Sequence, residues 1–235
     1  MQLSKRLQMV VDFVTKGMRV ADVGCDHAYI SIYLIEHEIA TNTIALDINK
    51  GPLMRAGENI KKYGYQDKIE TRLSDGLKKL KTGEADTIVI AGMGGPLMVK
   101  ILSDSMESVD AAKELVLQPQ SEIDTLRAYL HNSGFAIVEE AMCKEDGKYY
   151  TAMRAVKKEE AGDTSDAVDP VFLHYGKWLL KDKNPVLQEF LKKEQVKTAA
   201  ILESLENTDT EGAQSRKESL KKEIALLENA LQFYA

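Results

Sequence analysis

The sequence has little cysteine and no long apolar run. Its two cysteines lie far apart, outside any cluster with histidine that would hold zinc. No stretch approaches the roughly 18 apolar residues that a membrane-spanning helix needs. The first residues alternate polar and apolar side chains, unlike the core of a secretory signal. These absences argue against a disulfide framework and predict a cytoplasmic protein with no metal and no membrane attachment.

Positive charge is also in short supply. The chain has 31 Lys and Arg against 37 Asp and Glu, a formal net charge of -6. This balance argues against a general affinity for nucleic acids, but it is compatible with a local basic face. Hydrophobic residues make up 44% of the chain, enough for a core in one large domain or in a medium domain with an appendage.

The most informative stretch covers residues 19–29, with the sequence Arg-Val-Ala-Asp-Val-Gly-Cys-Asp-His-Ala-Tyr. A short buried-strand pattern ends at Gly24, and an apolar run typical of a helix follows. A glycine there permits a sharp bend and a close approach to a ligand, and the free N–H groups of the next helix point at negative groups. The pattern predicts the first ligand loop of a Rossmann-like domain.

The two glycine positions that should follow Gly24 hold Asp26 and Ala28. A carboxylate at this point would repel the pyrophosphate of NAD or FAD. S-adenosylmethionine has no phosphate and carries a sulfonium and an ammonium group, so the sequence favours it as the cofactor. The alternative is that Asp26 only caps the following helix.

Acidic residues also end two later predicted strands. Asp47 lies 23 residues after Gly24, at the end of a strand over residues 42–48. A carboxylate there can accept hydrogen bonds from ribose hydroxyls. The next strand, over residues 68–73, ends where methyltransferases bind the adenine amino group, although Asp-Gly is also a common plain turn. We expect the adenosine part of the cofactor to contact Asp47, Ile48, Ser74, Asp75 and Gly76.

A second glycine-rich turn follows the most strand-like stretch, residues 85–91, which we expect at the centre of a parallel sheet. In methyltransferases the end of the fourth strand holds the acceptor. The Asn-Pro-Pro-aromatic sequence of enzymes that methylate an exocyclic adenine amine is absent here. Three glycines in four residues permit close backbone approach to cofactor and acceptor, the alternative being a flexible turn. The predicted contacts are Ala91, Gly92, Met93 and Gly94.

The end of this first region separates two classes of α/β protein. Residues 135–142 and 149–156 alternate as strands and are joined by a short turn with a glycine, which predicts an antiparallel hairpin. A dehydrogenase would continue with parallel strands, whereas a class I methyltransferase closes its sheet with a reversed strand. We therefore predict a Rossmann-like methyltransferase domain over residues 1–157.

The composition changes after residue 157. Residues 158–169 read as a polar linker. Residues 170–235 have helical patterns, with one long helix starting at Pro185. Apolar residues of the last helix recur at spacings of 4, 3, 4 and 3, which predicts an antiparallel coiled-coil hairpin that either packs on the main domain or recognises a large substrate. These residues are Leu220, Ile224, Leu227, Leu231 and Tyr234.

Taken together, the chain resembles the bacterial TrmK family. The resemblance rests on Asp-Val-Gly-Cys-Asp-His-Ala at residues 22–28, Ala-Leu-Asp-Ile at 45–48, Ala-Gly-Met-Gly-Gly at 91–95, and the helical end. It implies S-adenosylmethionine-dependent methylation of N1 of adenine 22 in tRNA. It also implies tRNA as partner, and we expect a monomer. A methyltransferase of proteins or small molecules, or a non-catalytic cofactor-binding module, remain as alternatives.

Adenine N1 has a lone pair and no proton, so alignment and charge stabilisation matter more than a base. We expect Asp26 to stabilise the developing positive charge or accept an N6 proton. His27 and Tyr29 are candidates for holding the adenine by hydrogen bonding or stacking, although His27 can also be an ordinary loop residue. Arg6 can reach the cofactor if the first helix folds over it.

Overall fold

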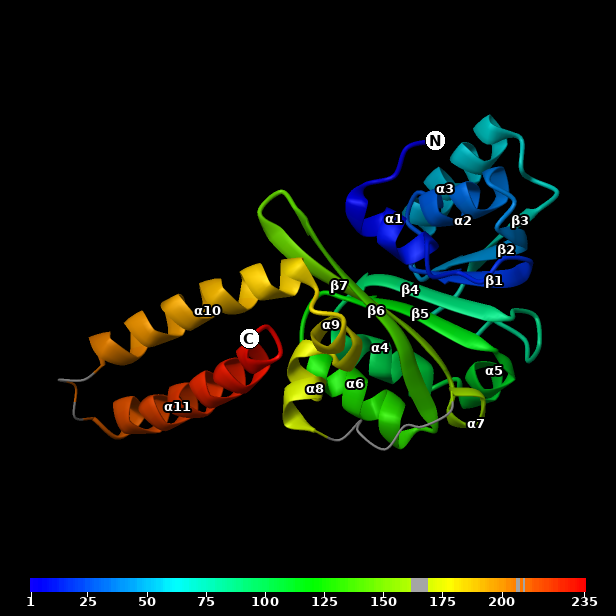
Figure 1. The fold of residues 1–235 in the computed structure, drawn as a ribbon. Helices are drawn as coiled ribbons and strands as arrows, with labels where there is room; N and C mark the ends of the chain where they lie inside the picture. Colours follow the sequence, from blue (N-terminus) through cyan, green and yellow to red (C-terminus); the bar gives the residue numbers. More distant parts are fainter. Residues whose placement is uncertain (162–168, 206–207, 209) are drawn as a thin grey trace. The chain divides into compact units, whose positions relative to one another are not determined.

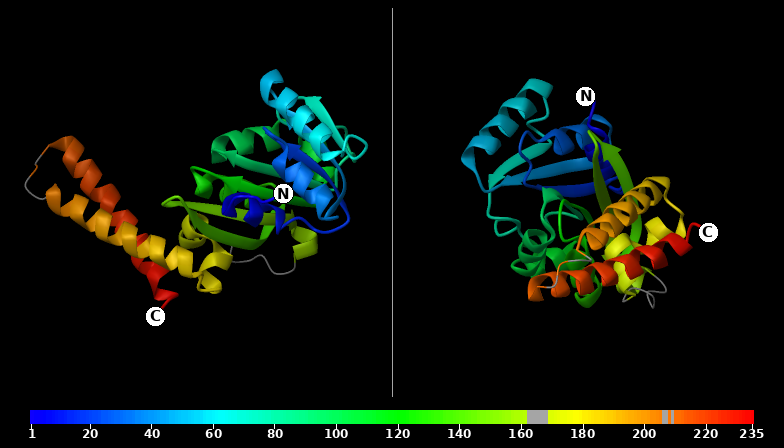
Figure 2. Two further views of the ribbon diagram at one scale, coloured as in Figure 1. Left: turned by 90° about the horizontal axis from the view of Figure 1, so that it is seen from above. Right: turned by 90° about the vertical axis from the view of Figure 1, so that its left-hand side faces the viewer.

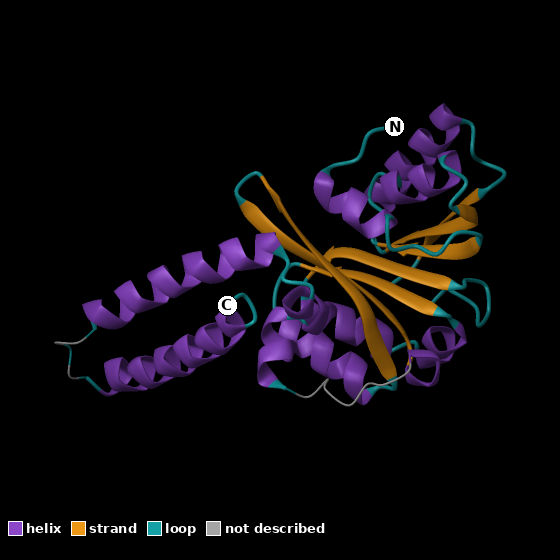
Figure 3. Cartoon of the chain, viewed as in Figure 1, coloured by secondary structure: helices purple, strands orange, loops and turns teal. Residues whose placement is uncertain are grey.

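The computed structural model describes residues 1–161, 169–205, 208 and 210–235. The chain divides into two compact units, residues 1–165 and 166–235. The first unit is an α/β domain built on one sheet, and the described part of the second contains helices but no strand (Figures 1 and 3).

One sheet of seven strands organises the first unit, in the spatial order β3-β2-β1-β4-β5-β7-β6. Its strands are β1 (Met18–Val23), β2 (Ala40–Asp47), β3 (Ile69–Leu73), β4 (Thr87–Met93), β5 (Glu114–Pro119), β6 (Phe135–Glu145) and β7 (Lys148–Lys157). Strands β1 to β5 pair in parallel, whereas β7 runs antiparallel to both β5 and β6. The predicted Rossmann-like class and its closing antiparallel hairpin are confirmed.

The central strands are apolar because both of their faces are covered. Strand β5 is buried along its whole length, and the first four residues of β4 are buried too. This is the pattern of a parallel sheet between two helix layers. Strand β4 extends two residues beyond the predicted end at Ala91, since its pairing with β5 resumes at Met93 after a register shift.

Helices cover both faces of the sheet, as the two views of Figure 2 show. They are α1 (Lys5–Val11), α2 (Tyr29–Glu36), α3 (Lys50–Tyr63), α4 (Gly95–Ser103), α5 (Met106–Ala111) and α6 (Ile123–Asn132), and a single-turn helix, α7 (Lys158–Ala161), comes directly after β7. Helices α1 to α3 bury apolar side chains in one core layer, and α4 to α6 do so in the other. The loops at the carboxyl ends of the strands are therefore held by two packed layers.

A buried carboxylate fixes the segment that follows α1. Glu114, at the start of β5, accepts hydrogen bonds from the backbone N–H of Thr15 at 2.9 Å and from its hydroxyl at 2.6 Å. It also accepts one from the hydroxyl of Thr87 at 2.8 Å. A buried carboxylate needs such donors, because leaving it unpaired would cost several kcal/mol. This anchor helps to hold α1 against the sheet.

The second unit consists of α8 (Pro170–Tyr175), α9 (Lys177–Lys181), α10 (Pro185–Ser204) and α11 (Glu211–Gln232). The long helix predicted from Pro185 is confirmed, and Asn184 caps it by accepting from two backbone N–H groups. Helices α10 and α11 pack together, and their buried residues include Leu191 and Leu227. Of the expected linker, residues 158–161 form α7 and 162–168 lie outside the described residues.

Within the described ranges, no helix has the length and apolar character needed to cross a membrane.

Candidate active site

The topology places a crevice at the carboxyl ends of β1 and β4. From β1 the chain runs outward through β2 to β3, and it then crosses back to β4 on the other side of β1, so the strand order reverses between β1 and β4. Open α/β sheets bind ligands at such a switch point. The loop after β1 and the glycine-rich turn after β4 meet there, because both strands end at this edge.

The loop after β1 keeps the backbone of a glycine loop without all of its glycines. Gly24, Asp26 and Ala28 have φ values of 74°, 40° and 56°. The left-handed region costs roughly 1–2 kcal/mol for a residue with a Cβ atom. The three positions where a Gly-x-Gly-x-Gly loop has glycine therefore retain its conformation. Helix α2 follows with Ala28 at its N-cap and no side-chain cap, so Asp26 does not cap it.

Three candidate catalytic side chains gather here, two on the loop and one, Tyr29, at the first position of α2. The Asp26 carboxylate lies 3.2 Å from Arg55 Nη2 and 3.8 Å from His27 Nε2. The rings of His27 and Tyr29 are stacked, with centroids 5.2 Å apart and planes inclined by 15°. The Asp26 side chain is 62% exposed, so its charge is available to a ligand despite the ion pair. The loop thus presents a carboxylate beside an aromatic pair.

These side chains border a cavity of about 450 Å³. Seven of the predicted site residues line it, together with five others from α1, β1, the loop, α2 and the end of β5. The predicted seven are Arg6, Gly24, Asp26, His27, Tyr29, Ala91 and Gly92, and the others are Leu7, Asp22, Cys25, Ile30 and Gln120. A cavity of this size can hold part of a nucleoside-sized ligand.

Helix α1 lies over one side of this cavity through Arg6. Its Nη1 donates to the side-chain oxygen of Gln118 at 2.8 Å, and its guanidinium lies 5.6 Å from the ring centre of Tyr150. A Cβ atom added to Gly92 would lie 3.4 Å from the same nitrogen. The first helix therefore folds over the end of β4, the condition under which Arg6 was expected to reach the site.

The predicted ribose and adenine ligands continue the same edge over β2 and β3. Asp47 is buried and accepts from the backbone N–H of Asn49 at 2.8 Å. Its own carbonyl accepts from the N–H of Ser74, which joins the two strand ends. Ile48 is 60% exposed between them. These residues therefore follow one another along the carboxyl ends of β2 and β3, next to the end of β1.

The turn after β3 is held by its own hydrogen bonds. The Ser74 hydroxyl donates to the carbonyl of Gly76 at 2.8 Å and accepts from the N–H of Lys79 at 3.1 Å. Asp75 is exposed and pairs with Lys78, whose hydrogen bond and charge lower the pKa of the Asp75 carboxyl. Asp75 is therefore an accessible carboxylate in a fixed turn.

Several glycines of the site leave room for neighbouring atoms that a side chain would displace. A Cβ atom on Gly24 would lie 2.3 Å from the terminal methyl of Met93, so that side chain packs directly over the first loop. A Cβ atom on Gly95 would lie 2.3 Å from the carbonyl oxygen of Glu122. Gly94 is the N-cap of α4, and a Cβ atom on it would lie 2.9 Å from the Ser121 hydroxyl oxygen. Only Gly92 of this turn lines the cavity.

One buried carboxylate at the bottom of the site was not among the predicted ligands. Asp22, in β1, is 2% exposed and accepts from the hydroxyl of Ser31 at 2.8 Å. Burial raises its pKa to about 6, although the hydrogen bond from Ser31 opposes this. Burial also raises the pKa of the neighbouring Cys25 thiol, which stays protonated at neutral pH.

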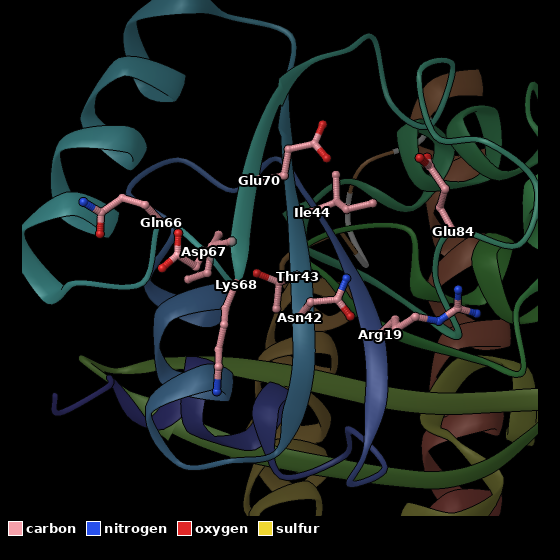
Figure 4. Close-up of a pocket in the computed structure, with 10 residues that line it drawn as sticks. Arg19, Asn42, Thr43, Ile44, Gln66, Asp67, Lys68, Glu70 and Glu84 are labelled. Atoms are coloured by element: carbon pink, nitrogen blue, oxygen red, sulfur yellow. The ribbon is translucent and has the colours of Figure 1, made fainter.

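A second cavity lies at the opposite edge, near the amino ends of β1, β2 and β3 (Figure 4). It measures about 430 Å³ and contains none of the predicted site residues. Two of its charged side chains already have partners, since Arg19 pairs with Asp86 and Glu84 with Arg72. The charges of these two side chains are therefore balanced within the fold.

Comparison with known proteins agrees with this geometry. A family model described as a methyltransferase domain matches residues 3–153. The chain is 35% identical over 236 residues to the tRNA (adenine(22)-N(1))-methyltransferase of Bacillus subtilis (strain 168), covering 98% of both proteins. The crystal structure of the Bacillus subtilis m1A22 tRNA methyltransferase TrmK superposes with a TM-score of 0.85 at 34% identity, covering 98% of this chain and 99% of that one. The chain belongs to the TrmK methyltransferase family.

A further member of the family was solved with its cofactor. The Streptococcus pneumoniae protein in complex with S-adenosyl-L-methionine has a TM-score of 0.85 and 32% identity, over 98% of this chain and 100% of that one. Membership of the family agrees with the resemblance noted in the sequence.

Several residues of the site escaped the sequence analysis. Asp22 could have been predicted, because it is an acidic residue two positions before Gly24. Asn59 of α3 donates to the backbone carbonyl of His27 at 3.0 Å, and no spacing rule connects these two positions. Gln118 and Gln120 reach the site because β5 lies beside β4 in the sheet. The position of these two glutamines depends on the order of the strands in the sheet, which no local spacing in the sequence indicates.

Proposed function

We propose that this protein transfers the methyl group of S-adenosylmethionine to N1 of adenine 22 in tRNA. The observation that carries the proposal is the loop after β1, which presents Asp26, His27 and Tyr29 to the cavity beside the end of β4. The relatives that match nearly the whole chain are named for this reaction. They favour tRNA over a protein or a small molecule as the acceptor.

The residues at the strand ends suit the cofactor. Asp47 uses one carboxylate oxygen for the N–H of Asn49, and no described residue donates to the other, which can accept from a ribose hydroxyl. The exposed apolar side chain of Ile48 suits the face of an adenine ring, and Asp75 can accept from its amino group. Asp22 and Arg6 line the cavity with opposite charges, which match the ammonium and carboxylate of a methionine moiety.

When bound, this cofactor supplies a methyl carbon on a sulfonium, and adenine N1 forms the new bond with its lone pair as the carbon–sulfur electrons pass to sulfur. The positive charge then resides on the base. The proposal assigns the stabilisation of that charge to the Asp26 carboxylate, which lines the cavity. The stacked His27 and Tyr29 offer a surface against which an extruded base can rest.

The proposal gives the two regions different tasks. Residues 1–157 carry catalysis, 158–169 connect, and 170–235 supply affinity for tRNA. The packing of α10 on α11 supports an antiparallel coiled coil, and each helix has buried leucines, Leu187 in α10 and Leu220 in α11. A monomer in the cytoplasm, where a tRNA substrate is available, completes the proposal.

The direct test is incubation of the protein with labelled S-adenosylmethionine and total tRNA, followed by mapping of the modified base. We expect one N1-methyladenine at position 22. Label on another base, or only on proteins or small molecules in a parallel incubation, would contradict the proposal. Cofactor binding without transfer to any RNA would support the non-catalytic alternative instead.

A further inference from the structure

We propose that Gln120 is a specificity-determining residue that recognises the exocyclic amine of the target adenine. The inference rests on the proposed function, since it names the side chain that tells adenine from other purines in that reaction.

The backbone fixes Gln120 beside the predicted acceptor position. Strand β5 ends at Pro119, and the next N–H, that of Gln120, donates to the carbonyl of Met93 at 2.9 Å. The Gln120 side chain lines the cavity, and its Nε2 lies 3.6 Å from where a Cβ atom of Gly92 would be. The absence of a side chain at Gly92 leaves the carboxamide next to the backbone at the end of β4.

A nearby glutamine shows the contrast between a structural and an available carboxamide. Gln118 is fully buried, its oxygen accepts from Arg6 at 2.8 Å, and its nitrogen donates to the carbonyl of Pro119 at 3.0 Å. Gln120 is exposed, and no described residue forms a hydrogen bond with its side chain. The first glutamine orients Arg6, whereas the second is open to a ligand.

A carboxamide matches adenine chemically. It offers an acceptor and donors without charge, and glutamine pairs with the N6 amine and N7 of adenine in nucleic-acid recognition. The Asn-Pro-Pro-aromatic sequence that would bring an amide from the end of β4 is absent from this chain. Gln120 supplies the same group from the neighbouring strand.

The contact also bears on the rate. Methylation at N1 places positive charge on the base, and conjugation shares that charge with the N6 amine. An acceptor of an N6–H hydrogen bond is therefore bound more tightly in the transition state than in the ground state. Gln120 is expected to act on kcat as well as on recognition.

The test compares variants of the full-length protein on two synthetic tRNAs, one with adenine and one with unsubstituted purine at position 22. Purine keeps N1 and lacks the amine, and its lower intrinsic reactivity affects all variants equally and cancels. We expect the adenine-to-purine ratio of kcat/KM to fall about tenfold in Gln120→Ala, the size of one hydrogen bond. Gln120→Glu, which keeps an acceptor, should retain most of the preference.

Gln66→Ala is the matched control, since Gln66 lies at the opposite edge of the sheet (Figure 4). It should keep the wild-type ratio, and calorimetry should give Gln120→Ala an S-adenosylmethionine affinity within about twofold of wild type. An unchanged ratio in Gln120→Ala overturns the inference, as does a loss confined to cofactor affinity. A wild-type protein that leaves position 22 unmethylated overturns the proposed function instead.

Discussion

The side-chain amide of Asn59 donates a hydrogen bond of 3.0 Å to the backbone carbonyl of His27. This carbonyl lies between two residues in the left-handed region, Asp26 at φ 40° and Ala28 at φ 56°. Such conformations persist in non-glycine residues only where the surroundings hold them. One turn earlier on α3, Arg55 contacts the Asp26 carboxylate. Helix α3 therefore holds the loop of candidate catalytic residues in its strained conformation.

Asn59→Ala should lower kcat more than it changes cofactor affinity. Loss of one hydrogen bond, worth about 1 kcal/mol, lets His27 and its neighbours leave the reactive arrangement part of the time. We expect a fall in kcat of about fivefold, measured by methyl transfer to tRNA, with S-adenosylmethionine affinity within about twofold. Glu58→Ala, an exposed neighbour on the same helix, should behave as wild type. An unchanged kcat in Asn59→Ala would show that the loop after β1 keeps its conformation without this hydrogen bond.

Gly24→Ala should destabilise the fold through two separable effects. The new Cβ atom would lie 2.3 Å from the methyl of Met93, and its φ of 74° is unfavourable for alanine. The backbone term costs roughly 1–2 kcal/mol and no neighbour can relieve it. Met93 ends in a flexible methyl, so the double variant with Met93→Ala should recover only the steric part. Urea unfolding of Gly24→Ala, Met93→Ala and the double variant measures both terms, and full recovery in the double variant would contradict the backbone term.

Much of the fold was predictable because most of its longer elements had a local cause. The continuous apolar run of β4, the glycine after β1 and the glycine turn between β6 and β7 each act within a few residues. Element ends were less predictable, since pairing with β5 carries β4 on to Met93. Helices α5 and α7 are a single turn or two and have no strong periodicity to detect.

Asp22→Asn should change the pH dependence of stability. The pKa of Asp22 is about 6 in the folded protein against an ordinary 3.8, so the folded state binds this proton more tightly than the unfolded state. The group therefore stabilises the fold below pH 4, and that contribution is lost as the pH rises through 6. Relative to wild type, Asp22→Asn should gain stability between pH 4 and pH 7.5, by up to about 3 kcal/mol.

Asp86→Asn is the control of opposite sign for this measurement. Hydrogen bonds and charge from Arg19 hold the pKa of Asp86 below its ordinary value. Its stabilising contribution is present at neutral pH and is lost on acidification, so this variant should lose stability at pH 7.5. Thermal unfolding at both pH values measures the two variants. If the stability of Asp22→Asn and that of the wild type changed equally between the two pH values, the raised pKa of Asp22 would be contradicted.

Asp26→Asn should abolish most of the turnover. The variant keeps the shape of the side chain and removes the charge that is proposed to stabilise the cationic base, which in comparable sites is worth about 100-fold in kcat. S-adenosylmethionine affinity should stay within about threefold, because the proposed cofactor contacts lie mainly elsewhere. Asp67→Asn, at the opposite edge of the sheet, controls for loss of a surface carboxylate. Turnover of Asp26→Asn at the wild-type rate would remove Asp26 from the mechanism.

The site was harder to predict than the fold because its parts come from distant positions. Gly24, Asp47 and Asp75 were found because each lies at the end of its own strand or just after it. Arg6 is held at the cavity by its hydrogen bond to Gln118, 112 positions away, and by its contact with the ring of Tyr150. A contact of this kind depends on strand order and on the packing of α1, neither of which leaves a spacing pattern in the sequence.

Removal of the helical unit should separate tRNA binding from cofactor binding. Residues 1–165 form a compact unit with two core layers of their own, so we expect this fragment to fold and to bind S-adenosylmethionine as the whole chain does. Its affinity for tRNA should fall at least about tenfold, with a shallower salt dependence, because phosphate contacts are lost. Filter binding at several salt concentrations measures both quantities.

A full-length charge-reversal variant provides the check if the fragment folds poorly. Lys221→Glu with Lys222→Glu changes two exposed residues of α11 and should leave the packing of α11 on α10 intact. It should weaken tRNA binding several-fold and reduce the salt slope, since each phosphate contact contributes about one counterion. S-adenosylmethionine affinity should stay at the wild-type value. Equal tRNA affinity and equal salt slope in the fragment and the whole chain would assign tRNA recognition to the methyltransferase domain alone.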